Sequence, residues 1–156
     1  MASTDFDFLF GEWIIHNRKI RDNTDAACTE WIEFDARGEA SPILGGAGNV
    51  DQMWVDDSPQ GAFVGFTMRL WSPVDQRWRI WWSDTGTPGV LDEPVIGLFV
   101  EGRGRFECVQ NVGGSDVLVR FEWTVDADAP QWNQFFSRDE GATWDHNWTM
   151  SFSRVN

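Results

Sequence analysis

Cysteine and histidine are scarce in this sequence, and the shortage narrows the classes of protein to which it can belong. The two cysteines, Cys28 and Cys108, lie far apart and form no CxxC pair, so we expect reduced core thiols rather than a disulfide scaffold. The two histidines, His16 and His146, do not complete a zinc site of the usual spacing. A chain of 156 residues can bury a core without such staples, and we predict no metal site.

Basic residues are also few. Twelve lysines and arginines stand against twenty-five acidic residues, which leaves a net charge of −13. A surface of this sign repels phosphate backbones and anionic lipids, so we expect neither nucleic acid nor a membrane as partner. No apolar run approaches the length of a membrane span, and the N-terminus lacks the basic segment of a secretory signal. A cytoplasmic location is the resulting expectation.

Aromatic residues, by contrast, are abundant and unevenly chosen. The sequence has eleven tryptophans and twelve phenylalanines but no tyrosine. A hydrophobic core alone rarely needs so much tryptophan. The composition therefore favours a cavity or an interface lined by some of these rings.

Segments in which apolar and polar residues alternate, as in a β-strand, recur along the whole chain. They are separated by turns rich in glycine, proline, serine and aspartate. We find no linker or change in composition and predict one domain over residues 1–156. The segments that alternate are 11–21, 29–36, 62–71, 78–82, 95–100, 105–109, 116–125, 131–137 and 144–155, with a glycine-rich stretch over 43–50. About ten short strands at even spacing predict an all-β fold, either an up-and-down barrel or a sandwich.

One pair of motifs favours the barrel. Gly11-Glu-Trp13 opens the first strand, and Arg154 lies near the end of the last. In lipocalin-like barrels, a G-x-W tryptophan plugs the closed end and an arginine of the final strand packs across its ring. A guanidinium supplies both stacking and hydrogen-bond donors to a buried indole.

A second motif lies near the C-terminus. The segment from Ser137 to Trp144 fits the Asp-box pattern S-x-D-x-G-x-T-W at every specified position. Asp139 is expected to accept backbone hydrogen bonds, Gly141 to adopt a positive φ and Trp144 to fold beneath the turn. We interpret these three residues as structural rather than catalytic.

Motifs spread over nearly the whole chain resemble an uncharacterised bacterial family expected to have a lipocalin-like (calycin) barrel. They include Phe8-Leu-Phe-Gly-Glu-Trp13, the glycine-rich 45–50 segment, Trp78-x-Ile-x-Trp82, Val119-Arg-Phe-x-Trp123 and the block from Trp132 to Trp148. The resemblance implies a single antiparallel up-and-down barrel. It implies no reaction, substrate or catalytic residue.

Several side chains are candidates for catalysis or ligand binding inside such a barrel. Strict alternation places His146 on one face with Trp148 and Met150, so we expect it to point inward, whereas His16 is expected to face outward. We assign the cavity lining to Trp82, Trp123, Phe99, Trp148 and Met150.

Two arginines lie within otherwise apolar strands. Arg69 and Arg120 each have two interpretations, a solvated outward ion pair or an inward group that anchors a ligand carboxylate or an oxyanion. Trp81 and Trp82 are adjacent and must point to opposite faces. An outward tryptophan favours a homodimer.

Three functions fit these residues. The first is a barrel that binds a small hydrophobic molecule, with an aromatic compound as one option. The second is a lyase, cyclase or isomerase on a hydrophobic metabolite, with His146 as acid or base and Arg120 or Arg69 beside it. The third is a haem-binding barrel with His146 as axial ligand. We predict no cofactor for the first two, and the sequence leaves open whether chemistry takes place inside.

Overall fold

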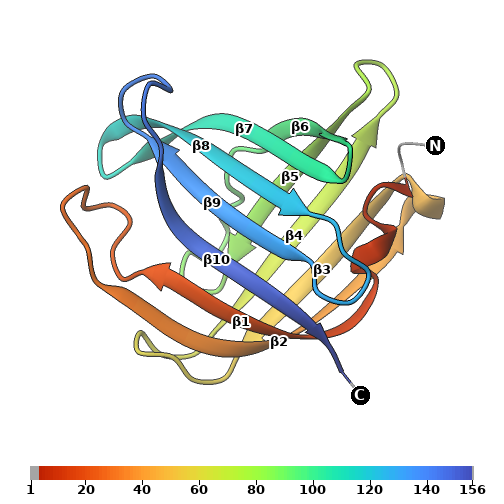
Figure 1. Ribbon diagram of the computed structural model, residues 1–156, viewed down its shortest axis with the longest axis horizontal. Coiled ribbons are helices and arrows are strands. Elements are labelled where there is room, and N and C mark those ends of the chain that lie inside the picture. The colour runs from red at the N-terminus through yellow and green to blue at the C-terminus, as the bar shows by residue number, and fades with distance from the viewer. Residues whose placement is uncertain (1–3, 156) are drawn as a thin grey trace.

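The computed structural model describes residues 4–155 and shows an all-β chain wound into one closed barrel (Figure 1). Each strand pairs antiparallel with the next in sequence, and β1 pairs with β10 to complete the ring. The strands are β1 (Gly11–Ile20), β2 (Trp31–Ile43), β3 (Gly48–Val55), β4 (Phe63–Ser72), β5 (Arg77–Asp84), β6 (Val95–Val100), β7 (Arg103–Val112), β8 (Ser115–Thr124), β9 (Gln131–Ser137) and β10 (Asp145–Arg154). The predicted up-and-down barrel of about ten strands is confirmed.

Alternation along the strands separates the barrel interior from its outer face. In β8, the side chains of Val117, Val119, Phe121 and Trp123 are buried, and the residues between them are more exposed. Successive side chains of a strand point to opposite faces, so these four project into the barrel. The same alternation on the other strands fills most of the interior with apolar groups.

Two strands differ from the prediction. β2 continues to Ile43, well beyond the expected end at residue 36, and β3 starts at the end of the glycine-rich 43–50 stretch and runs on to Val55, where no strand is predicted. The inward side chains of β3 include Asn49 and Asp51, both largely buried. Polar groups on the inner face hide the hydrophobic alternation by which strands are recognised.

The N-terminal segment plugs one end of the barrel. A 3-10 turn, η2 (Asp7–Leu9), follows Phe6, whose side chain is fully buried. The indole of Trp13 donates a hydrogen bond from Nε1 to the Leu9 carbonyl at 2.7 Å. The Arg154 guanidinium lies over the same indole, 3.7 Å from its ring centroid. The structure thus places tryptophan and arginine as the G-x-W pattern predicts.

Arg154 also ties the plug to the barrel wall. Its Nη1 donates to the Phe10 carbonyl at 2.7 Å and its Nη2 to the Phe8 carbonyl at 3.0 Å. Gly11 has a φ of +110°, and a Cβ at this position would lie 2.9 Å from Arg154 Nη1. The positive φ favours glycine here, and a side chain at this position would also displace the guanidinium.

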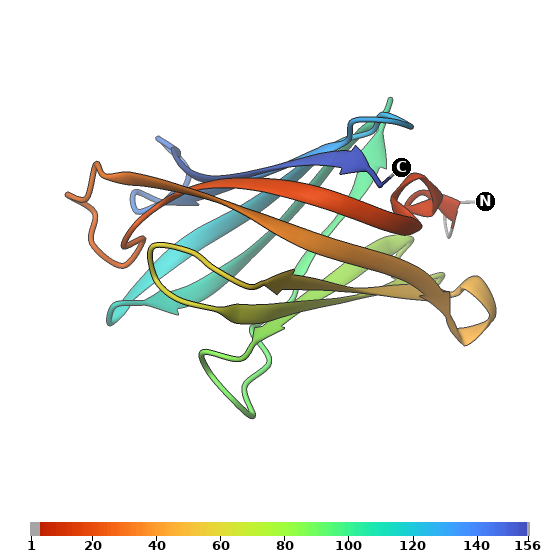
Figure 2. The same ribbon diagram turned by 90° about the horizontal axis from the view of Figure 1, so that it is seen from below.

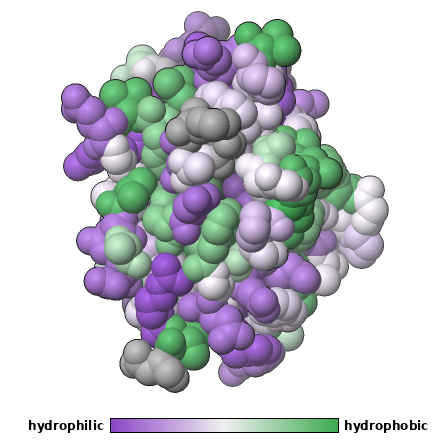
Figure 3. Space-filling view, turned by 90° about the vertical axis from the view of Figure 1, so that its right-hand side faces the viewer, coloured by the Kyte–Doolittle hydropathy of each residue, from purple (hydrophilic) through white to green (hydrophobic). Residues whose placement is uncertain are grey.

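The two ends of the barrel carry different segments. Figure 2 shows η2, the C-terminus and the β2–β3 connection, which contains the 3-10 turn η3 (Leu44–Gly46), at one end, and the β1–β2 and β3–β4 loops at the other. Figure 3 faces the plugged end, where hydrophobic and hydrophilic residues are interspersed. The opposite end carries a cavity lined by inward-facing side chains such as Trp148.

β10 contains a bulge that redirects one predicted site residue. His146 lies opposite Phe135, but Trp148 lies opposite Gln134, so Asn147 is an extra residue in the ladder. A one-residue shift moves every later side chain to the other face. Trp148 points inward, whereas His146 is exposed on the outer face. The predicted inward orientation of His146 is therefore wrong.

The β9–β10 turn has the hydrogen bonds expected of an Asp box. The Asp139 carboxylate accepts bonds from the Thr143 hydroxyl at 2.6 Å, the Thr143 amide at 2.8 Å and the Ser137 hydroxyl at 2.8 Å. These donors, with the Thr143 hydroxyl first, lower the pKa of Asp139 to about 2. Gly141 has a φ of +92°, in the left-handed region. All of these interactions hold the turn itself.

Candidate functional site

A cavity opens at the unplugged end of the barrel, and we call it the mouth cavity. Its volume is about 500 Å³. It lies among the β1–β2, β3–β4 and β5–β6 connections, which supply Asn23, Gln60 and Asp92 to its rim. Six aromatic side chains form much of its wall: Phe63, Trp82, Phe121, Trp132, Phe136 and Trp148. A concave, largely aromatic surface of this size is typical of a small-molecule site.

A smaller inner cavity lies deeper in the barrel. Its volume is about 40 Å³, and it reaches the plug at Leu9 and Trp13. Trp82, Phe121 and Trp132 line both cavities, so the two spaces adjoin at these three rings. One water needs roughly 10–15 Å³ of such space, so the inner cavity has room for only a few heavy atoms.

The aromatic wall of the mouth cavity is held by ring contacts. Trp148 packs edge to face against Trp132 at 5.3 Å and against Trp82 at 5.8 Å between ring centroids. Phe121 packs against Trp132 in the same manner at 5.0 Å. Such edge-to-face pairs restrict the ring orientations, so the wall is largely preformed.

Hydrogen bonds from two indoles fix the wall further. Trp148 Nε1 donates to Asn17 Oδ1 at 3.0 Å, and both residues are buried. Trp82 Nε1 donates to the Asp84 carboxylate at 3.0 Å. Each indole N–H is satisfied by the protein, so the faces of these rings are free to contact an apolar molecule.

Lys19 brings a positive charge to the aromatic wall. It is the only lysine in the sequence, and it points inward from β1. Its Nζ lies 4.4 Å from the Trp148 ring centroid, and among residues 4–155 no carboxylate comes within 4 Å of it. Burial lowers the pKa of Lys19, and the more distant Asp84 partly offsets this effect.

Asp84 and Asp92 make the rim acidic. Both line the mouth cavity, and the pKa of Asp92 is raised, first by burial and then by the negative charge of Asp84. The mouth therefore combines one ammonium group, two carboxyl groups and aromatic rings. The rim of the mouth is therefore polar, and the wall below it is apolar.

Arg69 lies inside the barrel at the floor of the inner cavity. Its side chain is 3% exposed, and its Nη2 forms an ion pair with Asp51 Oδ2 at 2.5 Å. Its Nη1 donates to Asn49 Oδ1 at 2.9 Å. Of the two interpretations left open by the sequence, the inward orientation of Arg69 holds. Its ion-pair partner lies on β3, the strand that the pattern did not reveal.

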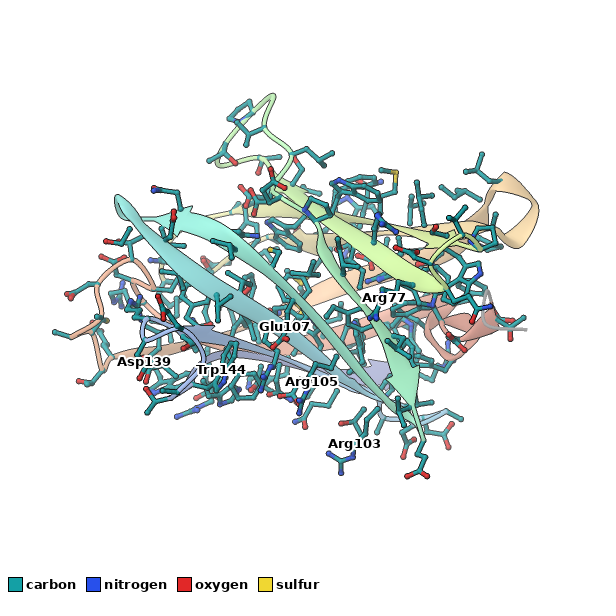
Figure 4. The ribbon with its side chains drawn as sticks, turned by 90° about the horizontal axis from the view of Figure 1, so that it is seen from above. Arg77, Arg103, Arg105, Glu107, Asp139 and Trp144 are labelled. Atoms are coloured by element: carbon teal, nitrogen blue, oxygen red, sulfur yellow. The ribbon has the colours of Figure 1, made fainter. Side chains whose placement is uncertain are left out.

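Arg120 takes the other orientation. It lies on the outer face of β8, where its guanidinium stacks on Trp144 at 3.8 Å from the ring centroid and its Nε donates to Glu107 at 2.7 Å. A second pair, Arg105 with Glu122 at 3.8 Å, lies on the same face. Figure 4 shows Arg105, Glu107 and Trp144 on the outside of the wall, with Asp139 in the nearby turn. Arg120 therefore does not reach the cavities.

Both histidines also lie outside the barrel wall. His146 Nε2 is within hydrogen-bond distance of Asn133 Oδ1 at 2.9 Å, and its ring packs on Phe135. His16 contacts Asp35 at 2.7 Å and Glu33 at 2.9 Å, and these hydrogen bonds raise its pKa. The chain has no other histidine, so no imidazole faces the interior to act as a base or to bind haem iron.

The residues assigned to the cavity fall in three places. Trp82, Trp123 and Met150 line the inner cavity, and Trp148 lines the mouth cavity. Phe99 points inward at the plugged end, with its ring centroid 4.9 Å from that of Phe6. It contacts the plug and lines a third hollow of about 1080 Å³ at that end, together with Phe10 and Trp71, and it lines neither of the other two cavities.

Sequence reasoning missed several polar groups that face the cavities. Lys19, Asn17 and Asp84 were not singled out, although each sits at an inward position of its strand. The alternation of β1 with the buried Trp13 could have revealed Lys19. Trp81 points outward at a partly buried position on β5, opposite its inward neighbour Trp82.

Cys28 and Cys108 are free and partly buried. Burial raises the pKa of Cys108 to about 11, which disfavours its reactive thiolate form. Among the residues described, no cluster of three or more His, Cys, Asp or Glu side chains has an arrangement for a metal ion. Within the same range, no helix is long and apolar enough to cross a bilayer.

Comparison with known proteins identifies no family for this chain. Neither the family models nor the curated proteins contain a match to it. The chain is thus described by its own geometry, a closed barrel of ten antiparallel strands with aromatic clusters inside.

Proposed function

We propose that this protein is a lipocalin-like barrel that binds a small, mostly apolar molecule through its mouth cavity. The observation that carries the proposal is the aromatic wall of that cavity, six rings around about 500 Å³. Buried apolar surface drives the association of such ligands with a preformed pocket. The plug at the opposite end makes the mouth the route of entry.

The wall is suited to binding because it is already ordered. The Trp82 and Trp148 rings are fixed by their hydrogen bonds to Asp84 and Asn17. A ligand therefore has few side chains to immobilise when it enters, which lowers the entropic cost of binding. The rim groups, Lys19 with Asp92, would select among apolar molecules by their polar substituents.

A retained ligand is the first test. Native mass spectrometry of the protein purified from cells, with an absorption spectrum of the same sample, is expected to show an added mass of a few hundred daltons or less. Since the interior has no imidazole, we expect no Soret band. If the measured mass is that of the protein alone, the protein is titrated with the neutral probe N-phenyl-1-naphthylamine, and binding is measured by the fluorescence of the probe.

Adjacent tryptophans offer a matched pair of variants for that titration. Trp82→Ala removes a ring that lines both cavities and is expected to weaken probe binding at least tenfold, as for a buried hot-spot residue. Trp81→Ala removes the same side chain from the outer face of the same strand and is expected to leave the affinity unchanged. Equal effects of the two variants, or no probe binding to the wild type, would overturn the proposal.

A further inference from the structure

The Arg69 guanidinium is fixed on several sides at the floor of the inner cavity. Its two terminal nitrogens bond to Asn49 and Asp51 of β3. Its Cζ lies 4.9 Å from the ring centroid of Phe6 and 5.7 Å from that of Trp123. This group is positioned as rigidly as a binding donor needs to be.

One nitrogen of this guanidinium has no hydrogen-bond partner. Arg69 Nε is buried, and among residues 4–155 no acceptor is within hydrogen-bond distance of it. A buried N–H without an acceptor is unfavourable, and native proteins rarely leave one without a reason. Arg69 is also part of the lining of the inner cavity, so a ligand atom in that space lies beside its side chain.

We propose that the floor of the inner cavity is a head-group subsite, where Arg69 Nε–H donates to an uncharged carbonyl-type oxygen of the bound molecule. This inference rests on the proposed binding function and adds the chemistry of the ligand. About 40 Å³ suits a head group of a few atoms, whereas the aromatic mouth cavity takes the ligand body.

The charges at the floor select a neutral acceptor over an anion. Asp51 already pairs with Arg69, so the two formal charges cancel within the site. A carboxylate at the same place would leave one negative charge without a partner among apolar side chains such as Leu9, Ile80 and Trp123. Unpaired buried charge is strongly unfavourable, whereas a carbonyl oxygen adds only an acceptor.

Three probes of nearly the same shape separate these chemistries. Acetophenone carries the carbonyl, α-methylstyrene replaces its oxygen with CH₂, and benzoate replaces the methyl ketone with a carboxylate. Isothermal titration calorimetry of the wild-type protein at pH 7 is expected to show acetophenone binding about tenfold more tightly than α-methylstyrene, since one hydrogen bond to a charged donor is gained. Benzoate is expected to bind most weakly.

The NMR signal of the Arg69 Nε–H tests the contact directly in the wild-type protein. In ¹H–¹⁵N spectra of the guanidinium region, the Arg69 Nε–H resonance, assigned by its loss in Arg69→Lys, is expected to shift on addition of acetophenone and much less with α-methylstyrene. Equal affinities for these two probes and an unmoved resonance would make Arg69 a purely structural residue. The binding function would then stand without this inference.

Asp51→Asn provides the converse test with an isosteric change. It removes the negative charge and leaves the guanidinium uncompensated, so the affinity for benzoate is expected to rise at least tenfold relative to acetophenone. Tightest binding of benzoate by the wild type would overturn the assignment to a neutral head group. Failure of all three probes to bind a wild-type protein that does bind N-phenyl-1-naphthylamine would overturn the subsite and leave the proposed function standing.

Discussion

Each end of the barrel places a cation over a tryptophan ring, but the two cations are held in different ways. At the plugged end, Arg154 stacks on Trp13 at 3.7 Å and donates to two backbone carbonyls of the N-terminal segment. At the open end, Lys19 lies 4.4 Å from Trp148, and the described residues provide no carboxylate within 4 Å. Arg154 thus uses its donors for the fold, whereas Lys19 keeps its donors for water or a ligand.

The contrast extends to what surrounds the rings. Trp13 donates to the backbone of the plug, and Phe6 and Leu9 fill the space behind it. Trp148 instead lines a cavity of about 500 Å³. Similar pairs of side chains thus hold the plug at one end and line a cavity at the other, and substitutions at the two ends are expected to differ accordingly.

The largest effect is expected from Trp13→Ala at the plugged end. It removes a fully buried ring together with its hydrogen bond to Leu9, and truncation of a buried tryptophan costs about 3–5 kcal/mol of stability. Urea unfolding followed by circular dichroism measures the change. Trp81→Ala is the control, with a smaller loss because that ring lies on the outer face. Equal losses of stability in the two variants would contradict the stabilising role of the plug.

Arg154→Ala is expected to lower the free energy of unfolding by about 2 kcal/mol, because charge-assisted hydrogen bonds and stacking on Trp13 are lost together. Arg154→Lys keeps the charge without the planar fork and is expected to restore only part of the stability. The same unfolding experiment decides between them. Full stability in both variants would show that the plug is held without Arg154.

Lys19→Met at the open end is expected to keep the wild-type stability within about 0.5 kcal/mol or to exceed it, because an apolar side chain replaces a partly desolvated charge that has no close partner. A loss as large as that of Arg154→Ala would contradict the comparison. It would mean that Lys19 is also part of the structural framework.

The smallest expected effect is a pH dependence that belongs to Lys19. Burial lowers the pKa of Lys19 in the folded protein, whereas in the unfolded chain this pKa is about 10.4. At pH values between these two pKa values, the unfolded chain therefore binds more protons than the folded protein. Wild-type stability relative to Lys19→Met is therefore expected to rise as the pH increases toward 10.4. Unfolding curves between pH 8 and 10.5 measure this difference, in which the titration of Cys108 cancels. A constant difference would place Lys19 in a water-like environment.

Local patterns were enough to predict the barrel and its plug. Alternation such as that of Val117 to Trp123 depends on nothing beyond a strand with one buried face. The contact of Trp13 with Arg154 is long-range, and it was predicted only because lipocalin-like barrels carry a G-x-W motif and a terminal arginine at these two places. Alternation itself requires no knowledge of how distant strands are aligned.

The polar part of the candidate site depends on long-range alignment and could not be predicted. Arg69 meets Asn49 and Asp51 only because β3 and β4 pair in that register. The polar inner face of β3 also concealed the strand itself. His146 was misplaced because a single bulge at Asn147 breaks the alternation, and a bulge leaves little trace in composition.

The sequential strand order also bears on how the barrel forms. Nine of the ten strand interfaces join neighbours in sequence, and only the β1–β10 seam brings together residues as distant as Trp13 and Arg154. Short connections close at low entropic cost, so the cost of loop closure is concentrated in that seam. Arg154 therefore acts as a latch. It fastens the last strand to the first segment of the chain, at the step that turns a curved ribbon of hairpins into a container.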